Sequence, residues 1–411
     1  IFESQSRHPG PRSNAALKKP MAGFAGKMSS VHVTHWEPIE FTSVEPEMEP
    51  QRHGDHPGKV VKAMEGVGAS WTLAHLLAEE ASQIALRVFL LDNSGSTCQA
   101  DGHVLVTSLG RTQPIPSSRW EEISSMAMEQ AEWNASLGVT CEFVLLNPPG
   151  GLTEPSKEGR DFVTIDPNQG DPRAQVARLA ELLKKNGPRG PTPLAYRIRQ
   201  LTTRMRKVKD DRRIMLSVVT DGIPTSTQSN AKDEFMRELR GFLDHLNAFV
   251  VIRLATDDDE VVKYYNRIDE ELELPLDILD DLNGEAKELH AIGNGWFAYT
   301  PLLHRIREGG ALNKLFDLLD ERMLELPEIA EMLELLFRRP EDPPFPRSAR
   351  QLYALAVQKS SNACNVFNGR KQCMTPPVDL KALKKALGLS PWQQVKQHLY
   401  QSILCAKNLP P

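Results

Sequence analysis

Residues 87–97 read Arg-Val-Phe-Leu-Leu-Asp-Asn-Ser-Gly-Ser-Thr, and the expected fold is built around this stretch. An apolar run over residues 84–91 has the length of a strand. It ends at a carboxylate, Asp92, which is followed by hydroxyls at Ser94 and Ser96. A short apolar run bounded in this way is typical of a buried strand. Since hard cations bind oxygen atoms from carboxylates, hydroxyls and water, the pattern predicts metal ligands at the tip of that strand.

Two further oxygen donors occur downstream in similar positions. Residues 214–220 read Ile-Met-Leu-Ser-Val-Val-Thr and predict a second buried strand, which ends at Asp221 before a Gly-Ile-Pro turn. Between the two strands, the sequence Gly-Pro-Thr-Pro places Thr192 in a loop that opens a helix. Open α/β sheets bind their ligands outside the carboxyl ends of the strands. We therefore expect these side chains to meet at one edge of a sheet.

The set Asp92, Ser94, Ser96, Thr192 and Asp221 resembles the metal-ion-dependent adhesion site of von Willebrand factor type A domains. The resemblance covers roughly residues 84–340 and every ligand position of the motif. It implies that Ser94 and Ser96 bind the metal directly and that Thr192 joins them in the ligand-bound state. It also implies that Asp92 and Asp221 hold the metal directly or through water. An Asp or Glu of a partner protein would then fill an open metal position. The implied ion is Mg2+, with Mn2+ or Ca2+ as alternatives.

Strand and helix patterns alternate along the rest of this region. Their alternation predicts an α/β fold with a doubly wound, mostly parallel sheet flanked by helices, as in Rossmann-like and von Willebrand factor type A domains. Thr192 is expected as the N-cap of a helix that starts at Pro193, so an ordinary capping role is the alternative to metal binding. Further strands are expected at residues 140–146, 162–165, 248–254 and 276–279, and helices at 60–82, 118–137, 172–185, 232–246, from 260, 284–291, 301–307 and 312–337.

One segment departs from the family pattern. The family helix usually starts directly after the Asp-x-Ser-x-Ser motif, whereas here residues 98–116 contain two glycines and two prolines. The helix signal comes only at Ser118-Arg-Trp-Glu121, a capping-box pattern. We expect an insertion beside the metal-binding edge, and whether it covers the site or folds away is left open.

The chain divides into three parts by composition. Residues 1–58 lack any sustained apolar period and predict an extended or disordered arm, in which His32, His35, His53 and His56 are read as solvated side chains. Residues 59–340 form the expected type A-like domain. Residues 341–411 predict a basic extension with helices at 347–359 and 380–404, since from Pro343 onward ten Lys or Arg residues stand against one acid, Asp379.

Composition narrows the class of protein. Hydrophobic residues make up 40% of the 411 residues and charged residues 25%, close to the values of ordinary soluble proteins. No run of about 18 apolar residues occurs, so a membrane span is not expected. Five widely spaced cysteines favour free thiols and a cytoplasmic location. Residues 1–30 hold five basic residues and one acid, which also resembles an organelle transit peptide. The density of aromatic residues and of Lys and Arg in the basic tail is too low to predict nucleic-acid binding.

Two classes of function remain open on the sequence. The favoured class is a metal-dependent binding module, an intracellular adaptor or scaffold rather than an enzyme. The alternative is a metal-dependent hydrolase or transferase that uses the same site, with His103 as a candidate base. Against the enzyme, the sequence has no Asp-x-Asp-x-Thr pattern, phosphate-binding loop or Gly-x-Ser-x-Gly motif. The acidic strand tip at residues 256–259 could hold a second cation, although carboxylates there are expected at a helix start. A glycosylation sequon at Asn134 is the one feature that favours an extracellular location.

Overall fold

The computed structural model describes residues 57–108, 111–208, 210–226, 230–256, 258–271 and 275–389. The expected arm falls outside the described residues, except that residues 57 and 58 begin the first helix. The four arm histidines also lie outside them. The same holds for the last part of the basic extension, from residue 390 onward.

A six-stranded sheet forms the centre of the fold, in the order β5-β4-β1-β6-β7-β8. Neighbouring strands are parallel except for β4 and β5, which pair antiparallel at one edge. The expected mixed α/β fold with a mostly parallel sheet flanked by helices is therefore confirmed. The strands are β1 (Ile84–Leu91), β4 (Cys141–Leu145), β5 (Phe162–Ile165), β6 (Arg213–Thr220), β7 (Ala248–Leu254) and β8 (Leu276–Leu279).

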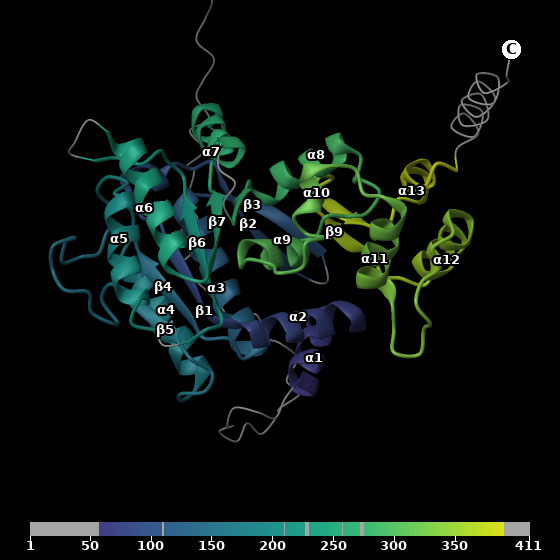
Figure 1. The fold of residues 1–411 in the computed structure, drawn as a ribbon, viewed down its shortest axis with the longest axis horizontal. Coiled ribbons are helices and arrows are strands. Elements are labelled where there is room, and N and C mark those ends of the chain that lie inside the picture. Colours follow the sequence, from purple (N-terminus) through teal and green to yellow (C-terminus); the bar gives the residue numbers. More distant parts are fainter. Residues whose placement is uncertain are drawn as a thin grey trace, which may run out of the picture. The chain divides into compact units, whose positions relative to one another are not determined.

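Helices cover both faces of this sheet, because alternate strand residues point to opposite sides. In β1, Val88 and Leu90 pack in the apolar cluster of α5, α6 and α7, whereas Phe89 and Leu91 pack with α3 and α4. Figure 1 shows these elements around the sheet. Among the described residues no helix is long and apolar enough to cross a membrane. The helices are α3 (Arg119–Leu137), α4 (Pro172–Lys185), α5 (Leu194–Met205), α6 (Ala231–His245) and α7 (Asp259–Glu271).

A third apolar cluster joins the first helices of the described chain to the last ones. It contains residues before β1, such as Leu77, together with Leu333 and with Phe345, Leu352 and Leu383 beyond residue 340. The proposed domain boundary at residue 340 thus crosses a shared apolar cluster. The remaining helices are α1 (Pro57–Gly66), α2 (Trp71–Gln83), α8 (Leu282–Ile292), α9 (Pro301–Glu308), α10 (Leu318–Glu321), α11 (Leu326–Phe337), α12 (Ala349–Ser361) and α13 (Leu380–Ala386).

The single helix expected over residues 312–337 is wrong. The structure has the one-turn helix α10, then an extended segment, and then α11. Glu325 caps α11 by forming a capping box with Glu328, and Pro327 lies in the first turn. Proline has no N–H for a helix interior, so the helix restarts there instead of continuing.

The helix expected over residues 380–404 is also wrong as far as it is described. Helix α13 ends at Ala386, and Gly388 has a φ of 67°, which ends the helix in the left-handed region. Before it, the expected loop contains an unpredicted hairpin, β9 (Val366–Asn368) and β10 (Cys373–Thr375).

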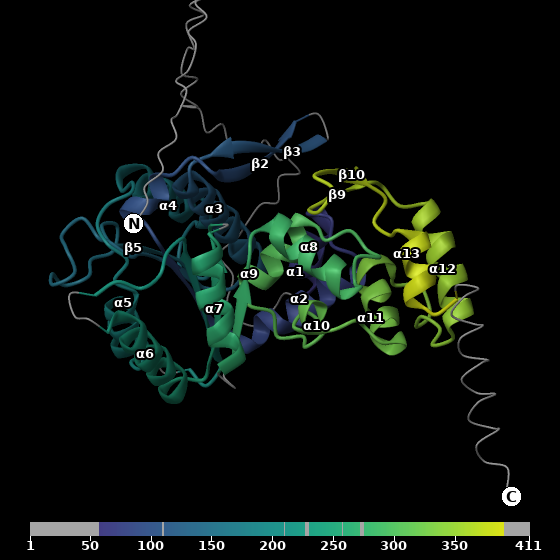
Figure 2. The ribbon, with the colours of Figure 1, turned by 90° about the horizontal axis from the view of Figure 1, so that it is seen from above.

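The inserted segment folds as a second antiparallel hairpin, β2 (Gly102–Ser108) and β3 (Arg111–Ser117). It follows a short 3-10 turn, Gly95–Cys98, and leads into α3 through the expected capping box of Ser118 and Glu121. Most of its side chains are exposed or half-buried. Figure 2 shows this hairpin extending next to the β9–β10 hairpin, and β3 contacts β10.

Candidate metal centre

The sheet topology brings the expected site residues to one place. From β1 the chain crosses to β4 on one side and later returns to β6 on the other side. Between β1 and β6 the loops at the carboxyl ends therefore leave in opposite directions, which is where open α/β sheets bind ligands. Asp92 and Asp221 directly follow these two strands. The backbone N–H of Asp92 donates to the carbonyl of Val219 at 2.9 Å, which fixes the two strand tips side by side.

Three side-chain oxygen atoms cluster at these tips. Ser96 Oγ lies 2.8 Å from Asp221 Oδ1, Ser94 Oγ lies 3.5 Å from the same oxygen, and the two serine hydroxyls are 3.0 Å apart. Adjacent ligands of an octahedral Mg2+ ion with bonds of about 2.1 Å stand roughly 3 Å apart. The donor chemistry and the spacing of these oxygens thus fit one face of a magnesium coordination shell.

Asp92 lies fully buried behind this cluster and holds its loop. One carboxylate oxygen accepts a hydrogen bond from Ser94 N at 2.8 Å, and the other accepts one from the Thr220 hydroxyl at 2.6 Å. Burial, with a contribution from the nearby charge of Asp221, raises the pKa of Asp92 to about 6. A cation near this carboxylate would favour its charged form.

The capping role expected for Thr192 is wrong. Helix α5 begins at Leu194 with Pro193 as its N-cap, and no side chain caps it. Pro193 has φ −81° and ψ 53°, and Leu194 N donates to the carbonyl of Thr192 at 2.9 Å. This is an inverse γ-turn, which separates Thr192 from the helix axis.

The side chain of Thr192 is instead directed toward the strand tip that ends at Asp221. A Cβ built on Gly222, the next residue, would lie 3.5 Å from Thr192 Oγ1. The backbone of Thr192 is fixed by Thr225, whose hydroxyl accepts from Thr192 N at 2.8 Å and whose own N–H donates to the Thr192 carbonyl. All five sequence-predicted residues are therefore found at the carboxyl-terminal edge between β1 and β6.

Paired amide side chains support the loops of the site. Asn93 donates to the carbonyl of Asn147 and accepts from its N–H, and Asn147 Nδ2 donates to the carbonyl of Pro191. Gly190 has a φ of 71°, and a Cβ there would lie only 3.0 Å from Asn147 Oδ1. Glycine is required at this position because a side chain would be strained and crowded. Its carbonyl accepts from Gly95 N, which ties the Thr192 loop to the serine loop.

Arg119 is a site residue that the sequence analysis missed. Its Nη1 lies 3.0 Å from Asp221 Oδ2, and its Nε and Nη2 each lie 2.7 Å from one oxygen of Asp101. The side chain is only 8% exposed. This guanidinium lowers the pKa of Asp101. Asp221 therefore faces the serine hydroxyls with one oxygen and a buried cation with the other.

The sequence signal for Arg119 is its position in the first turn of the first helix after the Asp-x-Ser-x-Ser motif. A cation at a helix start is unfavourable next to the helix dipole and needs a compensating anion. An arginine in this position therefore predicts a carboxylate partner close to it.

The other candidate residues do not join the oxygen cluster. His103 is exposed on β2, where its backbone N–H donates to Glu122. At the acidic strand tip, Asp258 accepts from Glu260 N at 2.8 Å and so caps α7. Asn134 of the sequon is fully buried, and its Oδ1 accepts a hydrogen bond from Arg87 at 2.7 Å. In the folded chain its side chain is therefore not accessible for glycosylation. Within the described ranges no group of three or more His, Cys, Asp or Glu side chains is placed to hold a metal, whereas the cluster at β1 and β6 depends on hydroxyls.

Comparison with known proteins gives no family. No family model matches the chain, and no curated protein matches it. Two crystal structures of the pilus adhesin SpaC from Lactobacillus rhamnosus GG, one of them in an open conformation, are similar to it with a TM-score of 0.31 and 14% sequence identity. The matches cover 47% and 48% of this chain and 28% of the adhesin chain. The chain thus matches less than a third of the adhesin's length, and this similarity is too low to assign a fold family or a function.

Proposed function

We propose that this chain is a von Willebrand factor type A-like protein that binds a protein partner through a divalent cation. The cation would be Mg2+, held by Ser94, Ser96 and Asp221, with Thr192 and Asp92 completing the site. The partner would contribute an Asp or Glu carboxylate. We propose further that the protein works in the cytoplasm as an adaptor or scaffold. The free thiols of the four described cysteines are consistent with a reducing compartment.

One observation carries this proposal. Side-chain oxygens of Ser94, Ser96 and Asp221, from two segments distant in sequence, converge between β1 and β6 with separations of 2.8, 3.0 and 3.5 Å. Neutral hydroxyls among them leave much of a 2+ charge uncompensated. When bound, the ion would supply a Lewis-acidic position for an outside carboxylate.

The residues of the chain have separate tasks in this scheme. The Ser94 and Ser96 hydroxyls would face the ion, and Asp92 would hold their loop through its bond to Ser94 N. Thr192 would be free to join, since its hydroxyl caps no helix. Arg119 engages Asp221 from the other side and limits how much negative charge that carboxylate offers.

Metal binding is tested first by thermal unfolding of chelator-treated protein with and without Mg2+. A site filled at ten times its dissociation constant adds roughly 1.4 kcal/mol, which corresponds to a shift of about 3 °C for a domain of this size. Ser96→Ala should abolish the shift, because it removes one of the clustered oxygens. Ser136→Ala, which removes an exposed hydroxyl on α3, is the matched control and should keep it.

The open position is tested with Mn2+-loaded protein by water proton relaxation. Glutarate, used as a carboxylate probe, should lower the relaxation enhancement by displacing water from the ion. A metal-dependent shift without any glutarate effect would leave a structural metal site and refute the binding function. No shift for wild type at several millimolar metal would refute the site itself.

A further inference from the structure

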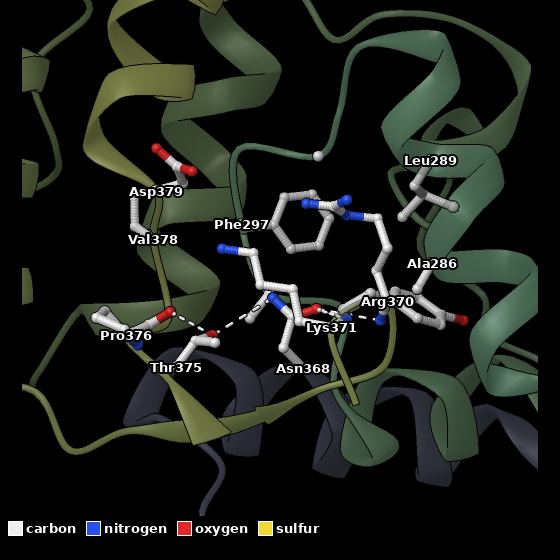
Figure 3. A pocket seen from close by; sticks show the side chains of 13 residues that line it. Ala286, Leu289, Phe297, Asn368, Arg370, Lys371, Thr375, Pro376, Val378 and Asp379 are labelled. Carbon is white, nitrogen blue, oxygen red and sulfur yellow. Dashed lines mark hydrogen bonds between the residues drawn. The ribbon is translucent and has the colours of Figure 1, made fainter. Parts of the chain in front are cut away.

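A separate pocket lies between α8, the segment before α9 and the β9–β10 hairpin. Its volume is about 230 Å3. Phe297, Val378 and Ala286 supply buried apolar walls, and Arg370 and Lys371 of the hairpin turn stand at its rim. Figure 3 shows both basic side chains leaving the turn, with the Arg370 guanidinium over the ring of Phe297 and the Lys371 ammonium on the side of Val378 and Asp379 in this view.

The turn that presents the two basic residues is held firmly in place. Asn368 Oδ1 accepts from the backbone N–H groups of Arg370 and Lys371 at 3.1 and 3.0 Å. Gly369 N donates to the carbonyl of Tyr299 at 2.9 Å, and the Gly369 carbonyl accepts from Asn283 of α8 at 2.8 Å. Because the backbone of the turn is bonded on both sides, the Cα atoms of the two basic residues are held in place beside the pocket.

The opposite walls are fixed to each other as well. Ala298 N donates to the carbonyl of Pro377 at 2.9 Å, and Asp379 N donates to the carbonyl of Trp296 at 2.8 Å. Phe297 and Val378 pair in an isolated antiparallel bridge. The pocket is therefore largely preformed, which lowers the ordering cost of binding a ligand.

The charge of this pocket is net positive, with two basic side chains and one acidic side chain in its lining. Within the described residues, neither the Arg370 guanidinium nor the Lys371 ammonium makes an ion pair or a side-chain hydrogen bond. The acid that lines the pocket, Asp379, caps α13 by accepting from Lys381 N and Ala382 N. Over residues 366–386 the sequence holds five basic residues against this one acid.

We propose that this pocket binds a small organic anion, a phosphate or carboxylate attached to a flat apolar group. The anionic group would lie between Arg370 and Lys371, where a guanidinium offers two parallel donors to an oxyanion. The apolar group would lie against Phe297 and Val378. The volume is below the roughly 300–1,000 Å3 of pockets for drug-sized ligands, so the ligand is about the size of one substituted ring. This proposal is independent of the metal site.

The test uses phenyl phosphate as the probe and calorimetric titration of the full chain in chelator. Wild type should bind phenyl phosphate at least about ten-fold more tightly than inorganic phosphate or benzyl alcohol, because only the ester offers both the charge and the ring. Arg370→Gln with Lys371→Gln should weaken binding at least about ten-fold. The matched control, Arg206→Gln with Lys207→Gln, removes two adjacent exposed charges after α5 and should bind as wild type does.

Two further variants keep the test decisive if the double variant does not fold. Lys371→Gln changes an exposed side chain and should weaken binding several-fold. Thr375→Phe keeps both charges and fills the pocket, so it should abolish binding of the ring. Equal affinity of wild type and these variants would overturn the proposal, as would wild type that does not bind phenyl phosphate more tightly than inorganic phosphate.

Discussion

Arg119 places a positive charge beside the oxygen atoms expected to hold a cation. Its distance of 3.0 Å to Asp221 Oδ2, in a position mostly shielded from water, means that it repels a second cation on the other carboxylate oxygen. At the effective dielectric of a partly buried site, that repulsion is worth on the order of 1 kcal/mol or more. Arg119→Gln should therefore raise the affinity for Mg2+ about five-fold or more, as measured by calorimetric titration.

Two controls separate charge from loop position in this experiment. Arg111→Gln removes an exposed charge from the first residue of β3, the strand that leads into α3, and should leave the affinity for Mg2+ unchanged. Asp101→Asn loosens Arg119 but keeps its charge, so it should not raise the affinity. Weaker Mg2+ binding by Arg119→Gln would contradict the electrostatic account and assign Arg119 a purely supporting role.

Asp92 predicts a pH dependence of stability in the metal-free protein. Its pKa of about 6 in the folded chain exceeds the value of about 3.9 in an unfolded one. The folded state then holds more protons between these values, so its free energy of unfolding falls as the pH rises from about 4 to about 6.

Asp92→Asn should remove the fall in the free energy of unfolding that the titration of Asp92 causes. Compared with wild type, the variant should gain roughly 2–3 kcal/mol between pH 4 and pH 7, measured by urea unfolding in chelator at several pH values. Asn can keep both local contacts, because the Thr220 hydroxyl is able to accept as well as donate. A difference between the two proteins that does not change with pH would show that Asp92 is not protonated in this range.

At the level of single residues, the sequence predicted those that belong to a local pattern. Ser94 and Ser96 follow a strand at fixed spacing, and Asp221 repeats the context of Asp92, so their convergence was expected from topology alone. Arg119 has only its place at a helix start as a signal, and Arg370 belongs to no such pattern. Their roles depend on which loops the tertiary fold brings beside them, and a single sequence does not contain that information.

Among the secondary elements, the β2–β3 hairpin is joined to the site at its base. A Cβ on Gly102 would lie 2.7 Å from the Ser118 carbonyl oxygen, inside the capping box that starts α3. Gly102→Ala should therefore destabilise the fold by about 1–3 kcal/mol and speed proteolysis within residues 103–116. The measurements are chemical unfolding and limited proteolysis.

Gly241→Ala is the control for Gly102→Ala, because it adds the same Cβ where there is space for it. Gly241 lies within α6, and no atom lies within 4 Å of a Cβ built there. The substitution should stabilise the protein by about 0.4–1 kcal/mol, because alanine restricts the unfolded chain more than glycine does. If both substitutions destabilise equally, crowding at Gly102 does not explain its effect.

Element types were predicted well where the pattern was strong and less well where a periodic pattern hid a break. Strand 248–254 and helix 172–185 occur as expected, since the first is an uninterrupted apolar run and the second has a cap and a clear helical period. Residues 312–337 share one apolar cluster on both sides of the break before Pro327. The apolar period over these residues therefore shows which side chains are buried. It does not show whether one helix or two helices bury them. The β2–β3 hairpin was missed because more than half of its strand residues are exposed, and the β9–β10 hairpin because each of its strands has only 3 residues.

At the scale of the whole molecule, the stretch after residue 340 shares its apolar cluster with the helices before β1. Phe345, Leu352 and Leu383 are at most 4% exposed, and each belongs to the cluster that includes α2 and α11. A chain ending at residue 340 would expose the surfaces that these side chains cover. Losing three such side chains alone removes several kcal/mol of burial, at about 1.5–3 kcal/mol each.

The chain ending at residue 340 should therefore unfold at a clearly lower temperature than the full chain and bind a hydrophobic dye before it unfolds. Differential scanning calorimetry and dye fluorescence measure the two effects. A chain ending at residue 389, which keeps α12 and α13, is the matched reference and should unfold at a clearly higher temperature than the chain ending at residue 340. An unchanged transition for the shorter chain would support a true domain boundary at residue 340.

The spacing of the oxygen cluster along the chain has a kinetic consequence. Ser94 and Asp221 are 127 positions apart, so their contact depends on the pairing of β6 with β1. We expect the oxygen cluster to be completed only after this pairing, because its few contacts add little to the pairing that first offsets the entropy of closing the loop. Bound Mg2+ would then stabilise the native state without stabilising the folding transition state. In stopped-flow experiments it should slow unfolding in proportion to site occupancy and leave the refolding rate unchanged, so that the ion prolongs the lifetime of the folded protein without helping it to fold.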